Sequence, residues 1–233
     1  MARVDELNIY RKRDLSLAED VYKEIEEKAF DYKEFINDYF KPMDISEKQR
    51  EERRKLANEM FNVFLFLFSL VEVSQNYNYL NVEYLVTQFE LQYAPLVMSY
   101  SRNDEYISGY VDKVSKDIVN TTVDNVRKPK DSGENKFATS DKRAALLSVN
   151  EANSVENYEE LQEAIENGYT KKSWCTMLDR KVRDTHRVLE GKTIPIDEYF
   201  EVGDDLLLFP RDEENCINNL GNIANCRCSL KFS

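Results

Sequence analysis

The sequence predicts an α+β protein, with a mainly α-helical N-terminal part followed by a small mixed α+β C-terminal module. The chain has 233 residues but only 6 glycines and 5 prolines, and several of these lie at or after Gly191. Long, uninterrupted helices are therefore expected before that segment. From Lys171 onward, short β-prone runs alternate with turn-forming residues, a pattern typical of small strands.

The N-terminal part is expected to be helical throughout. Apolar residues recur at helical spacing between residues 18 and 40, and Pro42 then interrupts the pattern. The letters SEKQ predict a second helix that begins at Ser46 with a capping box, in which Ser46 and Gln49 satisfy each other's exposed amides. This helix is expected to continue to about Ser74.

Two further helices are expected before residue 129. The stretch 81–100 carries one apolar stripe, and Pro95 is expected to kink this helix. The next helix is expected to begin at Asn103, a suitable N-cap, and to end before Pro129. Its apolar side chains recur at helical intervals at Ile107, Tyr110, Val111, Val114 and Ile118.

Residues 129–141 combine Pro, Gly and charge without periodicity, which predicts a linker or loop. It would separate a helical region, residues 1–128, from a C-terminal domain, residues 142–233. The domain is expected to open with helix, to contain a fresh N-cap at Asn157, and to end this helical stretch at Gly168.

The strands of the C-terminal module are expected in five short runs, with one or two helical turns in DTHRVLEG that end at Gly191. Trp174 is interpreted as a core anchor at the start of the module. The five runs are KKSWCTMLD, KTIPI, EYFEVG, DLLLFP and RCSLKF.

No targeting or membrane segment is expected. The first twenty residues lack the apolar core of a signal peptide. The strongest apolar stretch, residues 60–73, is too short to span a bilayer and is interrupted by polar side chains, so a core helix is expected there. The four cysteines of such a chain are expected to be reduced thiols.

The formal net charge of −12 disfavours non-specific wrapping of nucleic acid, which requires Lys and Arg to displace counterions. Residues 169–192 form an exception, because seven basic side chains outnumber three acidic ones there. Such a segment is usually a solvated face, but here it is also a candidate contact for phosphate or an acidic partner. The candidate contact residues are Lys171, Lys172, Arg180, Lys181 and Arg187.

Asp179, Arg183 and His186 would share one helix face, because they are spaced at i, i+4 and i+7. One interpretation is a local ion pair beside a packed imidazole. The other is a site in which the carboxylate orients the histidine for acid–base chemistry. Both interpretations remain open at this level.

Cys226 and Cys228 form a C-x-C pair near the end of the chain. Together with His186, the only histidine, and either Cys175 or Cys216, they are candidate ligands for a structural zinc ion. The alternative is a half-buried strand that needs no metal. In that strand, Cys226, Cys228 and Leu230 would face inward, and Asn225, Arg227 and Ser229 would face outward.

From about Arg143 to the C-terminus, the ordered motifs resemble the Mu F-like phage minor head proteins, also called phage head morphogenesis proteins. An Asn/Glu-bearing helix is followed by G-x-x-x-K-x-W, D-x-x-V-R-x-x-H, a glycine, F-P-x-D and a terminal N-C-R-C. The residues that carry the resemblance include Trp174, Asp179, Arg183, His186, Gly191, Pro210, Asp212, Asn225, Cys226 and Cys228.

The resemblance implies a phage or prophage minor capsid protein, not an enzyme, with the portal protein or major capsid protein as partners and local contact with packaged DNA. It would reside in the virion, at the capsid interior or portal vertex, and in the host cytoplasm during assembly. The helical residues 1–128 would dock onto the portal or capsid. No cofactor is expected other than the zinc alternative. The rival hypothesis is a nuclease or transferase that uses the His186 face.

Overall fold

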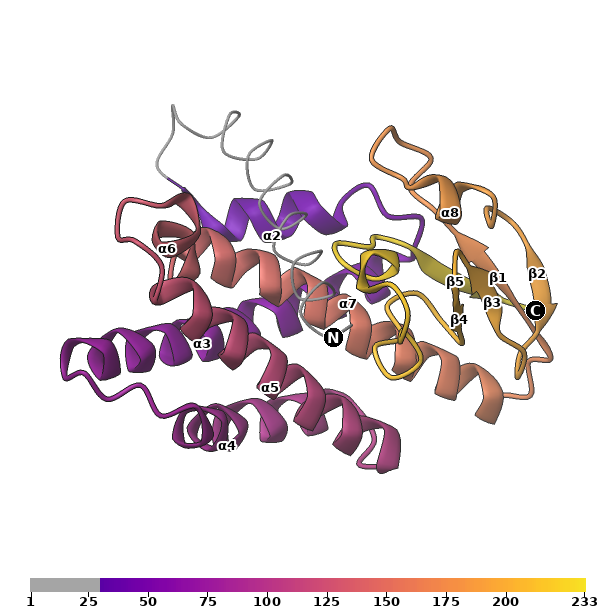
Figure 1. Cartoon of the computed structure of the whole chain (residues 1–233). Helices are drawn as coiled ribbons and strands as arrows, with labels where there is room; N and C mark the ends of the chain where they lie inside the picture. Colours follow the sequence, from indigo (N-terminus) through magenta and orange to yellow (C-terminus); the bar gives the residue numbers. More distant parts are fainter. Residues whose placement is uncertain (1–29) are drawn as a thin grey trace. The chain divides into compact units, whose positions relative to one another are not determined.

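The computed structural model describes residues 30–233 and confirms the α+β class (Figure 1). Helices precede a C-terminal region with small antiparallel strands. The described residues form two compact units. We call residues 30–37 with 53–152 the helical unit, and residues 38–52 with 153–233 the sheet unit.

The first two described helices match the predicted break and capping box. Helix α2 spans Tyr32–Phe40 and ends before Pro42, while the earlier part of the expected helix lies outside the described residues. Helix α3 spans Glu47–Asn76. The Ser46 N–H donates to Gln49 Oε1 at 2.8 Å, and the Gln49 N–H donates to Ser46 Oγ at 3.2 Å. The capping box is therefore confirmed.

Helices α4 and α5 lie next to each other in the helical unit (Figure 1). Helix α4, Val82–Tyr100, runs without interruption through the exposed Pro95. Helix α5, Glu105–Val126, is capped by Asp104, whose carboxylate accepts the Ile107 N–H at 3.0 Å. The predicted cap at Asn103 is wrong by one residue, whereas all five predicted apolar positions of α5 are buried.

The core of the helical unit is aromatic. The ring of Phe64 lies 5.7 Å from that of Phe89 and 6.1 Å from that of Tyr93. Among the described residues, α3 is the one helix long and apolar enough to cross a membrane by length and composition. Core helices of soluble proteins meet the same criterion, and α3 contributes Phe64 and its apolar neighbours to this core.

The segment predicted as a linker or loop, residues 129–141, contains a further helix. Helix α6 spans Gly133–Ala138, and Ser132 caps it by accepting the Asn135 N–H. This segment also lies within the helical unit. The domain limits inferred from sequence stay a prediction.

Helix α7 is continuous from Asp141 to Glu166, so the fresh cap predicted at Asn157 is wrong. Asn157 is buried in mid-helix, where its amide binds carbonyls outside the helix. The predicted stop at Gly168 is confirmed. Its φ is +78°, its N–H donates to the Ile165 carbonyl, and the Tyr169 N–H donates to the Ala164 carbonyl.

The sheet unit contains the five predicted strand runs in short form. β1 is the central strand of an antiparallel sheet of order β2-β1-β5, in which Trp174 lies opposite Leu230. β3 and β4 form a separate hairpin. The bounds are β1 Lys171–Cys175, α8 Asp184–Arg187, β2 Thr193–Pro195, β3 Phe200–Val202, β4 Asp205–Leu207, the 3₁₀ turn η1 Leu220–Asn222, and β5 Ser229–Phe232.

Candidate functional site

Trp174 anchors the core of the sheet unit, as predicted. Its side chain is fully buried on β1. The indole meets the Phe200 ring edge to face at 5.1 Å and the His186 ring at 5.5 Å with an interplanar angle of 89°. Such perpendicular contacts are the preferred geometry of aromatic pairs. The tryptophan therefore fixes one side of the His186 ring.

His186 lies on α8, a single helical turn within the predicted segment DTHRVLEG. Arg183 is the N-cap of α8 and has extended backbone, so the helix begins only at Asp184. Asp179 therefore does not lie on this helix and cannot share a helix face with His186. Asp179 instead turns the chain by accepting the Lys181 N–H and pairs with Arg227 at 2.6 Å. The Arg183 guanidinium donates to the Ala224 carbonyl. The predicted helix face shared by Asp179, Arg183 and His186 is therefore wrong, although the His186 N–H donates to the Arg183 carbonyl at 3.0 Å.

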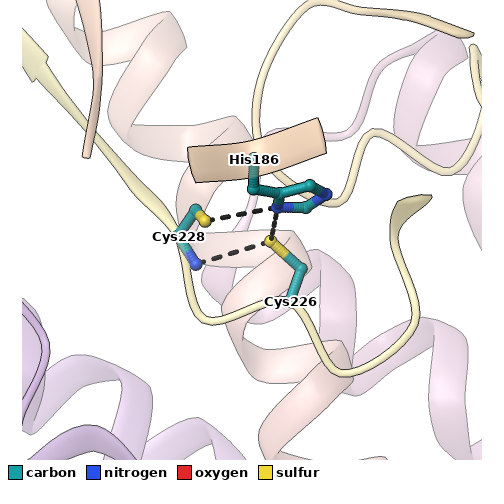
Figure 2. A group of neighbouring side chains, drawn as sticks. All are labelled: His186, Cys226 and Cys228. Atoms are coloured by element: carbon teal, nitrogen blue, oxygen red, sulfur yellow. Dashed lines mark hydrogen bonds between the residues drawn. The ribbon is translucent and has the colours of Figure 1, made fainter. Parts of the chain in front are cut away.

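Cys226 and Cys228 lie in the loop before β5 (Figure 2). The expected strand from residue 225 begins only at Ser229, because Asn225 adopts a left-handed conformation and the Cys226 N–H donates back to the Ile223 carbonyl. Both cysteines are buried as predicted, but so is Ser229, which was expected to face outward.

The two sulfurs converge on one nitrogen of the imidazole. His186 Nδ1 lies 3.4 Å from Cys228 Sγ and 3.5 Å from Cys226 Sγ (Figure 2). The other ring nitrogen, Nε2, lies 2.8 Å from the Asn222 carbonyl oxygen. A carbonyl only accepts, so Nε2 carries a proton, and Nδ1 is the ring nitrogen that faces the two sulfurs. We call these three residues the Cys–His centre.

The two thiols of the Cys–His centre differ in acidity. Burial acts to raise the pKa of Cys226, but the hydrogen bond from the Cys228 thiol and the interaction with the adjacent His186 ring hold that pKa well below its usual value. The hydrogen bond to Cys226, together with burial, raises the pKa of Cys228 well above its usual value. Negative charge therefore concentrates on the Cys226 sulfur, and thiolate is the metal-binding and nucleophilic form of cysteine.

Neither cysteine suggested as a fourth ligand belongs to the Cys–His centre. The Cys216 Sγ lies 3.3 Å from the Asn219 carbonyl oxygen and 3.6 Å from Asp205 Oδ2. The Cys175 thiol contacts the Ser173 carbonyl, and burial raises its pKa. Among the described residues, the candidate metal-ligand set of His and Cys contains three members, all buried.

Buried amides on α7 hold the loop that carries the cysteines. Asn153 Nδ2 donates to the Cys226 and Cys228 carbonyls at 3.2 and 3.4 Å. Asn157 Nδ2 donates to the carbonyls of Cys228 and Pro210 at 3.3 and 3.0 Å. Sequence reasoning missed both roles, although buried-face spacing of polar residues at 153, 154 and 157 was the available signal.

Arg211 occupies the variable position x of the F-P-x-D motif, and its buried side chain also holds nearby backbone in place. Its Nη1 donates to the Ile223 carbonyl at 2.8 Å, and its Nη2 pairs with Glu213 at 3.0 Å. The neighbouring Asp212 accepts the Leu208 N–H at 2.8 Å. Pro210 and Asp212 thus help to fix the conformation of the loop that follows β4.

Gly191 has a related role in the turn after α8. Its φ is +69°, a left-handed conformation that L side chains rarely adopt, and its N–H donates to the Trp174 carbonyl at 2.9 Å.

The basic surface of the sheet unit is smaller than predicted. Lys171, Arg180, Lys181 and Arg187 are exposed. Lys172 is fully buried, with its Nζ 5.6 Å from the centre of the Phe200 ring and without a hydrogen bond among the described residues. It is therefore not part of the exposed surface.

A comparison with known protein families gives a match for the second half of the chain. The family model described as Phage Mu protein F like protein matches residues 119–231. No curated protein and no solved structure matches the chain. The matched residues include the whole Cys–His centre and the exposed side chains of Lys171, Arg180, Lys181 and Arg187.

Proposed function

Residues 119–231 form a domain of the Phage Mu protein F like family, and on this basis we propose that the chain is a minor capsid protein of a phage or prophage. The family is one of phage head morphogenesis proteins. The match carries the proposal because it extends from α5 to β5 and includes every motif of the C-terminal module. The protein would act in assembly of the head, at the portal vertex or the capsid interior.

The helical N-terminal region is the proposed docking surface for the portal or major capsid protein. Support comes from the loop between α3 and α4 and the first turn of α4, where Tyr77, Tyr79 and Tyr84 are exposed. Tyrosine is enriched in protein–protein interfaces, because it supplies a large contact area and a hydrogen-bonding group. Much of this region lies outside the family match, as a partner-specific surface would.

Local contact with DNA is the second part of the proposal. The exposed side chains Arg180, Lys181 and Arg187 lie close in sequence within an otherwise acidic chain. They suit transient contact with phosphate better than tight wrapping, because a net charge of −12 repels DNA elsewhere on the molecule.

The rival enzymatic proposal finds little support in the geometry. A general acid or base has to reach the substrate, but His186 is 2% exposed and both ring nitrogens have partners. Asp179 pairs with Arg227 and does not orient the imidazole. A role for this centre in holding the fold agrees better with these contacts.

Co-sedimentation tests the docking proposal. The purified chain is expected to co-sediment with proheads assembled from the cognate portal and capsid proteins. Replacement of Tyr77, Tyr79 and Tyr84 by Ser is expected to weaken this binding at least tenfold. The control replaces Tyr169 and Tyr199, which are exposed in the sheet unit, and is expected to bind normally. Failure of the unmodified chain to bind proheads or portal would contradict the proposal.

A further inference from the structure

We propose that His186, Cys226 and Cys228 bind one zinc ion, with water as the fourth ligand. The inference is independent of the proposed capsid role, because it rests on the geometry of the Cys–His centre alone. It also differs from the four-ligand sets of three cysteines and one histidine considered from the sequence, since Cys175 and Cys216 have other contacts.

The spacing of the ligand atoms matches a tetrahedral ion. Zinc lies about 2.3 Å from sulfur and about 2.0 Å from nitrogen, which places a nitrogen and a sulfur ligand about 3.5 Å apart along a tetrahedral edge. The observed distances from His186 Nδ1 to the two sulfurs are 3.4 and 3.5 Å. All three ligand atoms lie within 4.8 Å of one another, so the ion requires at most a small adjustment of the sulfurs.

The imidazole is already oriented as metal-binding histidines are. Such residues donate their second ring N–H to a carbonyl or carboxylate, which fixes the tautomer and leaves the other nitrogen free to coordinate. His186 Nε2 meets the Asn222 carbonyl at 2.8 Å. Asn222 is itself held, because its Nδ2 donates to the Val202 carbonyl and to Asp205 Oδ2, both at 2.8 Å.

The cysteine loop is equally well fixed. The Cys228 N–H points at Cys226 Sγ across 3.4 Å, a contact that favours negative charge on the sulfur (Figure 2). Asn153 and Asn157 hold the carbonyls of both cysteines, so the loop does not need to be ordered when the ion binds. Preorganisation of this kind lowers the entropic cost of binding.

Charge balance and ligand chemistry favour zinc in particular. Two thiolates and one Zn²⁺ sum to zero, and a neutral cluster is far less costly to bury than an isolated ion. The combination of thiolate and imidazole suits zinc, whereas carboxylate sites suit magnesium and calcium. In this arrangement the ion would join α8 to the loop before β5 and thereby reinforce the packing around Trp174.

Metal analysis tests the proposal directly. Tag-free protein purified without chelators is expected to contain one zinc ion per chain by mass spectrometry. After replacement by Co²⁺, sulfur-to-metal charge-transfer absorption in the near ultraviolet and intense tetrahedral d–d bands are expected. A folded chain that holds neither zinc nor added cobalt would overturn the proposal, as would a Cys226–Cys228 disulfide in protein isolated under reducing conditions.

Variants distinguish this site from adventitious binding. Cys228→Ser is expected to lose at least half of the charge-transfer intensity, and His186→Gln to weaken zinc binding at least tenfold. The controls are Cys175→Ser and Cys216→Ser, which alter buried cysteines of the same unit and are expected to retain one zinc ion. Full stoichiometry in every variant of the Cys–His centre would contradict the assignment. The cobalt spectrum of the unmodified chain remains decisive even if a variant fails to fold.

Discussion

Lys172 is enclosed by protein although its neighbours Lys171 and Ser173 reach the surface. Burial lowers the pKa of its ammonium group from 10.5 to about 8, and the charges of Asp212 and Asp197 offset only part of the effect. A buried cation beside an aromatic ring keeps some stabilisation from the ring quadrupole, but it loses its hydration. Lys172 is therefore expected to reduce stability at neutral pH.

This burial predicts stability that rises with pH. Between pH 8 and 10.5 the unfolded chain keeps the Lys172 proton while the folded chain has released it, so the free energy of unfolding increases with pH across this range. The contribution is about 3 kcal/mol, since each pKa unit corresponds to about 1.4 kcal/mol. The measurement is urea denaturation from pH 7 to 10, monitored by Trp174 fluorescence.

Lys172→Met isolates this contribution from other titrating groups. The variant is expected to be more stable than the parent at pH 7, and the difference is expected to shrink as the pH rises. Lys171→Met serves as the control, because that side chain is exposed and should change stability little at any pH. A stability difference between Lys172→Met and the parent that does not vary with pH would refute the explanation.

At the scale of elements, the end of α7 depends on the backbone of one glycine. Gly168 has a φ of +78°, and a Cβ added there would meet no atom within 4 Å. Gly168→Ala is therefore expected to cost about 1 kcal/mol through backbone strain alone. Gly133→Ala is the control, because that site is equally open but has no left-handed φ, and it should be neutral or slightly stabilising. Equal urea midpoints for the two variants would contradict this account.

The buried amides of α7 give a second prediction at this scale. Asn157→Ala removes the buried hydrogen bond that the side-chain amide donates to the Pro210 carbonyl. Because a buried acceptor then loses this donor, the free energy of unfolding is expected to fall by about 1 to 3 kcal/mol. Asn167→Ala removes a comparable hydrogen bond, from the side-chain amide to the Glu163 carbonyl, but at an exposed position. Its expected effect is within about 0.5 kcal/mol. Similar losses in both variants would show that burial is not the cause.

Sequence reasoning predicted elements better than it predicted contacts between them. The capping box at Ser46 and the stop at Gly168 depend on residues a few positions apart, so local patterns reveal them. The cap predicted at Asn157 is wrong because its side chain binds carbonyls more than fifty residues away. The spacing likewise groups Asp179 with Arg183, whereas its partner Arg227 lies 48 positions away.

The candidate site was only partly foreseeable for the same reason. His186, Cys226 and Cys228 were grouped correctly, because scarce residue types narrow the choice to a few combinations. Cys175 and Cys216 are excluded as zinc ligands by their contacts with the Ser173 and Asn219 carbonyls, and the spacing of cysteines in the sequence does not reveal such contacts. The charge of Lys172 predicts a surface position, yet this side chain is buried on the central strand of the sheet.

At the scale of the whole molecule, acidity limits how DNA is bound. Replacement of Arg180, Lys181 and Arg187 by Glu is expected to lower DNA affinity at least tenfold and to reduce the slope of log K against log salt by about 2 to 3. Fluorescence anisotropy over a salt series measures both quantities. A control with the same change in net charge replaces the exposed lysines Lys41, Lys48 and Lys130.

The two charge-reversed proteins separate a local contact from a general field. If DNA binds through residues 180–187, the control is expected to keep most of its affinity. Equal weakening of both proteins would show that only net charge matters and would remove the basis for a specific DNA contact.

The division of the chain has a consequence for any attempt to dissect the protein. The sheet unit includes residues 38–52 as well as residues 153–233, and within it Lys231 pairs with Asp44. If a protease cuts the chain between residues 129 and 141, the two fragments would therefore remain associated under native conditions. They would part only in denaturant, so a single peak in gel filtration would not prove that the polypeptide is intact.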